Sequence, residues 1–124
     1  MDNFDHQIAI AEGFVLLGTI VEAWDTLEEL PASFRTLPEV LKVRLMICTR
    51  LDHWEMGKVI AEVINSGHEY EVREAAGRFH LDHAIALSAA GDVPGARAAV
   101  GALAIVWPEG RVLARVSKAL AAVW

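Results

Sequence analysis

One pattern of turn, apolar and small residues recurs three times in this chain, and it constrains the fold more than any other feature. The first copy consists of Gly18, Ile20, Ala23, Leu27 and Leu30. Thirty-four residues later the same spacing gives Asp52, Trp54, Gly57, Ala61 and Ile64, and thirty-nine residues further on it gives Gly91, Val93, Ala96, Val100 and Leu103. Recurrence at about this length is typical of chains built from stacked pairs of helices.

Composition agrees with one helical domain. The chain has 124 residues, of which 54% are hydrophobic, and much of the excess over an average domain is alanine, which suits closely packed helices. We therefore expect a single all-α domain over residues 1–124. The longest uncharged apolar run, 98–108, has eleven residues, which is well below the roughly 20 needed to cross a bilayer. The lone cysteine, Cys48, cannot form an internal disulfide, so a reducing cytoplasm fits best.

Turn signals divide the chain into seven expected helices and no strand, because every segment between them has helical spacing. The first two helices are expected at 3–16 and 19–30, and the third runs from a capping box at 36–39 to Leu51. The fourth is expected at 53–65, the fifth from a capping box at 66–69 to Ala90, the sixth at 93–105, and the last from Pro108.

Several large apolar side chains carry specific burial expectations. Trp54 is expected to be a core residue, Trp24 and Trp107 are expected to pack between helices, and Trp124 is expected to be partly exposed. The last helix is expected to cover the open end of the stack with Val112, Leu113, Val116, Leu120 and Val123.

The repeated residues resemble the tetratricopeptide repeat family across essentially the whole chain. Ala23, Gly57 and Ala96 match the small residues at which helices of that family approach closely, while Leu45 departs from the pattern. Pro108 follows Gly91 by seventeen residues, where the family's repeat-ending proline is expected. The resemblance implies a right-handed α-solenoid of three antiparallel helix pairs, in repeats of about 3–36, 37–67 and 68–107, followed by a capping helix at 108–124.

The resemblance also implies a function. The first helix of each pair lines a concave surface, which in this family commonly receives an extended peptide or a helix of another protein. Such a chain would be an interaction module or small scaffold and not an enzyme, and it would need no cofactor. The concave surface would be lined by Asp5, Ile8, Glu12, Val15, Glu39, Lys42, Met46, Thr49, Arg50, Leu81, Ile85 and Ser88. The binding groove on it would include Glu12, Lys42, Met46, Thr49, Arg50, Leu81 and Ile85.

His80 and His83 raise an alternative. Two histidines three residues apart lie on the same side of a helix and can share a metal or a small ligand. Local spacing supplies no third ligand, and the neighbouring apolar residues equally suit two partly buried rings. We therefore assign no metal residues, and the small-ligand or metal-binding reading stays second to protein binding.

Charge is distributed unevenly. Residues 1–34 carry seven acidic side chains and no Lys or Arg, whereas residues 91–124 carry four basic side chains against two acids. The net charge of −6 argues against nucleic acid as a partner, because that partner requires a concentrated basic surface. The uneven charge has two interpretations. The charged residues form a solvated surface, or they support weak head-to-tail self-association in which Arg111, Arg115 and Lys118 contact the acidic end of another copy.

Overall fold

Most of residues 3–124 are helical. A computed structural model describes residues 3–124, so residues 1 and 2 of the expected domain lie outside the described part. Within it are seven α-helices, three short 3-10 helices and no strand, which confirms the all-α prediction. The α-helices are α1 (Asn3–Leu17), α2 (Ile20–Glu28), α3 (Pro38–Leu51), α4 (Trp54–Ala61), α5 (Tyr70–Ala89), α6 (Val93–Val106) and α7 (Arg111–Val116), and the 3-10 helices are η1 (Ala32–Phe34), η2 (Pro108–Gly110) and η3 (Lys118–Val123).

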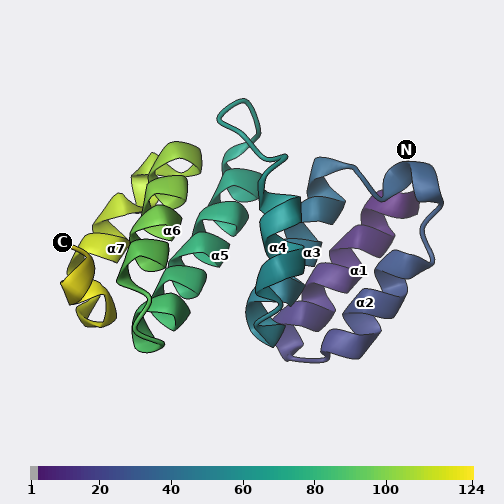
Figure 1. Cartoon of the computed structure of the whole chain (residues 1–124). Helices are drawn as coiled ribbons and strands as arrows, with labels where there is room; N and C mark the ends of the chain where they lie inside the picture. The colour runs from purple at the N-terminus through teal and green to yellow at the C-terminus, as the bar shows by residue number, and fades with distance from the viewer. Residues whose placement is uncertain (1–2) are drawn as a thin grey trace.

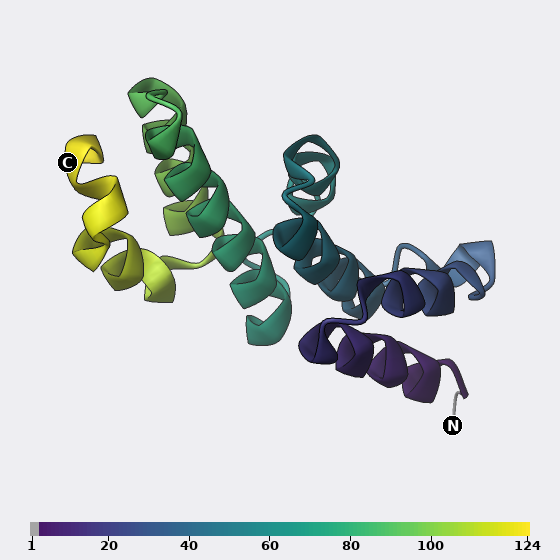
Figure 2. The same ribbon diagram turned by 90° about the horizontal axis from the view of Figure 1, so that it is seen from below.

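Most helices pack mainly against a neighbour in the sequence, but α3 packs chiefly against α5. α1 contacts α2, α3 contacts α4, and α5 contacts α6, while α3 also lies between α1 and α5. The helices form a row with the two termini at opposite ends (Figure 1), and the view from below shows that the row is bent (Figure 2). No helix in residues 3–124 combines the length and the apolar character needed to cross a membrane.

Turn residues end α1, α3 and α5 close to where the sequence predicts. Gly18 and Gly91 both adopt a φ of +84°, a left-handed conformation that glycine reaches without steric cost. Asp92 then caps α6, since its Oδ1 accepts a hydrogen bond from the Gly95 N–H at 2.9 Å. Asp52 ends α3 with a φ of 56°, a conformation that aspartate tolerates better than most residues.

The two predicted capping boxes do not form. α3 begins one residue after Leu37, without a side-chain cap, because Pro38 supplies a preorganised first turn that lacks an N–H needing a partner. At 66–69 the preceding turn is closed differently, with the Gly67 N–H donating to Asn65 Oδ1 at 2.8 Å. The Asn65 N–H in turn donates to Nδ1 of His68 at 3.1 Å. The fourth helix correspondingly ends at Ala61, four residues earlier than predicted.

The small residues of the repeat lie at close helix contacts. Ala23 and Ala96 are fully buried, and Gly57 is also buried. A Cβ added to Gly57 would stand 2.9 Å from Cδ1 of Phe79 and still nearer to two other atoms of that ring. The absence of a side chain at this position therefore lets α4 approach α5.

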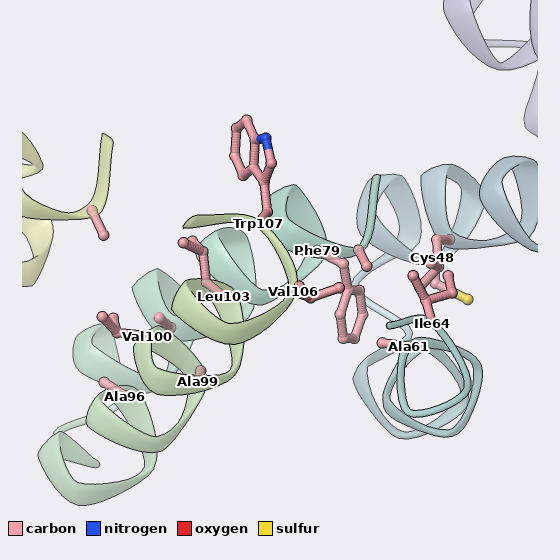
Figure 3. Packing of buried hydrophobic residues seen from close by; sticks show 14 of the residues in the cluster. Cys48, Ala61, Ile64, Phe79, Ala96, Ala99, Val100, Leu103, Val106 and Trp107 are labelled. Atoms are coloured by element: carbon pink, nitrogen blue, oxygen red, sulfur yellow. The ribbon is translucent and has the colours of Figure 1, made fainter. Parts of the chain in front are cut away.

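Two apolar clusters form the core, and α3 belongs to both. Val40, Val43 and Ile47 face α1 and α2, whereas Leu45 and Cys48 join the larger cluster of α4, α5, α6 and the C-terminal segment. Figure 3 shows that larger cluster, with residues of α6 on one side of Phe79 and Cys48 on the other. The two-sided burial of α3 joins the halves of the molecule.

A buried arginine connects α2 to α3. Arg44 is only 8% exposed, and its guanidinium donates to a Glu28 carboxylate oxygen at 2.6 Å. The same group lies over the ring of Trp24, 4.5 Å from its centroid. The hydrogen bond from Arg44 is the largest cause of the lowered pKa of Glu28. Trp24 is thus partly buried, as predicted for a residue between helices.

The C-terminal segment differs from the predicted capping helix. It consists of η2, α7 and η3, with a break at Ser117, whose ψ of 121° is extended. Leu120 and Val123 are buried as expected, but the predicted burial of Val112, Leu113 and Val116 is wrong. The break turns the chain, so that η3 packs on α5 and α6. In α7 only Ala114 is buried, and Val112, Leu113 and Val116 are left on the surface.

Candidate functional site

The face made by α1, α3 and α5 contains the predicted groove. A hollow of about 200 Å³ opens where these three helices meet. Four of the predicted residues line it: Met46, Thr49, Arg50 and Leu81. Val15, which was expected on the same surface, also lines it, and the lining residues that the sequence reasoning missed are Leu16, Ala75, Arg78 and Asp82. Those residues come from turns of α1 and α5 that the sequence places on helices without fixing their register against α3.

Among the described residues that line this hollow, Arg50 supplies a positive charge without an ion-pair partner. It lies in the last turn of α3 and is exposed. Its Nη1 donates to the Val15 carbonyl oxygen at 3.2 Å, which holds the guanidinium over the end of α1. Among residues 3–124, no carboxylate oxygen lies within 4.0 Å of it. Arg78 is already engaged, because its Nε donates to Glu74 at 2.9 Å and its guanidinium lies over Trp107.

Lys42 occupies a different electrostatic setting. Its Nζ forms an ion pair with Glu12 at 3.0 Å, a contact that the sequence reasoning missed because it joins helices thirty residues apart. The surrounding depression is lined by Asp5, Ile8, Ala9, Glu12, Glu39 and Lys42. Three carboxylates surround one ammonium group, so this end of the face is acidic.

Ile85 does not join the hollow. It is partly buried against the larger apolar cluster, as is Leu81, but only Leu81 also lines the space beside Arg50. The predicted groove therefore consists of two separate parts: an apolar hollow beside Arg50 and an acidic depression beside Lys42. Both lie along α1 and α3, near opposite ends of these helices.

The histidine pair lies in another hollow, of about 320 Å³, which Glu55 and Asp92 also line. The His83 ring stacks on Trp54 at a centroid distance of 5.0 Å and an interplanar angle of 12°. Trp54 is partly buried and not a fully enclosed core residue. Burial is the main cause that lowers the pKa of His80 to about 4, and it also lowers the pKa of His83.

No set of three His, Cys, Asp or Glu side chains in residues 3–124 is arranged to hold a metal ion. The His80 ring meets Phe79 edge-on, with centroids 5.5 Å apart. The His83 ring therefore packs against α4, whereas the His80 ring packs on Phe79 of its own helix. Cys48 is fully buried, and burial raises the pKa of its thiol, which disfavours the reactive thiolate.

A larger hollow, of about 630 Å³, lies at the C-terminal end. It brings together Arg97, Arg111 and Arg115 beside Trp124. Arg111 and Arg115 were predicted as part of a basic end, but Arg97 was missed because it comes from the preceding helix. Trp124 is 53% exposed, as predicted.

Comparison of the chain with family models, with curated proteins and with solved structures gave no match in any of the three.

Proposed function

We propose that this chain is a tetratricopeptide-like interaction module, a right-handed α-solenoid of three helix pairs closed by a C-terminal segment. Its role is to bind another protein on the face of α1, α3 and α5. The proposal is supported by the pairing of successive helices and by the burial of the repeated small residues Ala23, Gly57 and Ala96. It assigns the chain no catalytic step and no cofactor.

The hollow beside Arg50 carries this proposal. Its floor includes Val15, Met46 and Leu81 from three different helices, and the unbranched Met46 side chain can adjust to an apolar anchor of a partner. Arg50 stands at the edge with no carboxylate partner among the described residues, and its planar guanidinium can bind a carboxylate through two hydrogen bonds. The site thus suits a peptide or helix that places an apolar side chain next to an acidic one.

The acidic depression beside Lys42 determines in which direction a bound peptide or helix runs along α3. Lys42 is neutralised by Glu12, and Asp5 and Glu39 add negative charge around it. An acidic side chain of the partner is favoured near Arg50 and disfavoured near Lys42. A bound segment should therefore run along α3 with its acidic end at the C-terminal end of that helix.

Selection from a displayed library of random peptides tests the proposal without a known partner. The wild-type chain should enrich peptides that combine an apolar residue with Asp or Glu. Arg50→Glu should weaken binding of the enriched peptides about tenfold or more, because it replaces the attraction by repulsion. Lys42→Glu is the matched control: it makes the same charge change on the same helix, but the Lys42 charge is already paired.

Three results would count against this function. The first is that the library yields no enriched family of peptides. The second is that the enriched peptides bind Arg50→Glu as tightly as they bind the wild type. The third is that Lys42→Glu weakens peptide binding as much as Arg50→Glu does. Circular dichroism must show equal helix content in all three proteins, since Arg50 is exposed and its replacement has little effect on folding.

A further inference from the structure

The hollow at the C-terminal end is built from three segments. α6 contributes Arg97, Val100, Gly101 and Ala104, α7 contributes Arg111, Val112 and Arg115, and the chain end contributes Val123 and Trp124. Val112 is 60% exposed and Trp124 is 53% exposed. We call this surface the arginine hollow. It joins apolar surface to three cations on a chain whose net charge is −6.

Carbonyl oxygens and an aromatic ring hold the three guanidinium groups, and no ion pair within the described residues neutralises them. Arg97 Nε donates to the Val123 carbonyl at 3.0 Å, and Arg111 Nε donates to the Pro108 carbonyl at 3.3 Å. The Arg115 guanidinium lies over the Trp124 ring, 4.8 Å from its centroid. None of the three has a carboxylate within 4.0 Å in residues 3–124. An anionic partner would therefore meet positioned donors.

The same chain carries a matching anionic surface at its other end. Glu22, Asp25 and Glu29 are exposed, and their spacing of three and four residues places them along one side of α2 and its C-cap. None of these acids forms an ion pair within the described residues. Val21, beside them, is 69% exposed. We call these four residues the acidic face of α2.

The two surfaces cannot meet within one molecule, because α2 and α7 lie near opposite ends of the row (Figure 1). They can meet between molecules. We propose that the acidic face of α2 of one copy docks on the arginine hollow of a second copy. Three carboxylates then face three guanidiniums, and Val21 adds an apolar contact to Val112 and Trp124. Such a contact joins different surfaces of the two copies, so each dimer leaves one surface free at each end and the assembly grows head to tail.

Sedimentation of the full-length chain tests this contact. At about 20 mM salt the mean mass should rise with protein concentration up to about 1 mM, and at about 500 mM salt it should return to that of the monomer, because salt screens exposed charges. Arg111→Glu with Arg115→Glu should weaken the association about tenfold or more, and so should Glu22→Lys with Asp25→Lys.

Mixing the two double variants gives the sharpest result. Each has lost one surface but keeps the other, so an equimolar mixture should associate although neither variant does so alone. Loss of folding cannot produce this rescue. Lys58→Glu with Lys118→Glu is the matched control, because it changes the net charge as much as the arginine variant. Lys118, which the sequence grouped with Arg111 and Arg115, does not line the arginine hollow, and neither does Lys58. Arg111→Gln with Arg115→Gln serves as a second, milder disruption.

A wild-type chain that stays monomeric at low salt and high concentration overturns the proposal, and the arginine hollow would then be left for another anion. Association that survives in both double variants, or a mixture that stays monomeric, also overturns it. Peptide binding beside Arg50 is measured separately and does not depend on the outcome.

Discussion

Replacing Gly57 by alanine should destabilise the protein, although the same replacement elsewhere in a helix should stabilise it. Gly57 lies in α4, where alanine has a helix propensity about 1 kcal/mol better than glycine. The added Cβ, however, would overlap the ring of Phe79, which is fully buried. The Phe79 ring is enclosed by Trp54, at a centroid distance of 5.6 Å, and by His83, at 5.8 Å, so it cannot turn aside freely.

The size of the effect follows from these two contributions. Overpacking a close-packed core costs about 1–3 kcal/mol, and a severe overlap with an enclosed ring belongs at the upper end. After the gain in helix propensity, the free energy of unfolding of Gly57→Ala should fall by about 2 kcal/mol. For a chain of this length, that loss corresponds to a melting temperature lower by about 8 °C.

Gly13→Ala is the matched control. Gly13 lies inside α1, and a Cβ there would meet no atom within 4 Å. This variant should therefore gain about 0.5–1 kcal/mol from helix propensity alone. Urea unfolding followed by circular dichroism measures both variants, provided that the denaturant dependence stays equal to that of the wild type.

A double-mutant cycle assigns the cause. Phe79→Leu shortens the obstructing ring, so it should cost less in the Gly57→Ala background than in the wild type, with a coupling energy of about 1 kcal/mol. If Gly57→Ala is as stable as the wild type, or if the two substitutions are additive, then α4 does not approach α5 as described. If Gly13→Ala is destabilising as well, the loss in Gly57→Ala cannot be assigned to the overlap with the Phe79 ring alone.

Four further outcomes are expected. Burial lowers the folded-state pKa of His80 to about 4 from 6.5, so as pH falls between these values the unfolded chain binds a proton that the folded chain does not. The free energy of unfolding should then fall by roughly 1–3 kcal/mol more in the wild type than in His80→Gln. Titration with zinc should give no heat above dilution, and measurable heat that is lost in His83→Ala would restore the metal-binding alternative. Cys48 should react with a thiol reagent only through unfolding, which predicts a labelling rate that rises with urea. Ala23→Trp and Ala96→Trp should each cost about 1–3 kcal/mol or more, and an unchanged melting temperature in either would contradict its burial.

Local signals predicted the helices well, because turns depend on a few adjacent residues. Gly18 and Gly91 end helices in the left-handed conformation, and Asp92 caps the helix that follows. The capping boxes failed where another local option was better, as at Pro38 and in the turn closed by Asn65. Single-sequence patterns do not determine which of two competing turns is more stable.

The candidate site was only partly predictable, because it depends on how distant helices are positioned against each other. Helical spacing places Met46, Thr49 and Arg50 on one surface of α3, and the structure brings them together with Leu81. The ion pair that engages Lys42 depends on the register between α1 and α3. The position of Arg44 could have been used for a prediction. It stands among the buried apolar positions of α3, where a charged side chain needs an ion-pair partner.

Because α3 contributes buried residues to both apolar clusters, it influences the rate and the order of folding. Most tertiary contacts join helices that are close in the sequence, and chains with such local contacts fold quickly because little loop entropy is lost before contacts form. Either cluster can nucleate first, but neither is complete without α3. Substitutions that weaken α3 itself should therefore slow folding, whereas changes near either end should mainly accelerate unfolding.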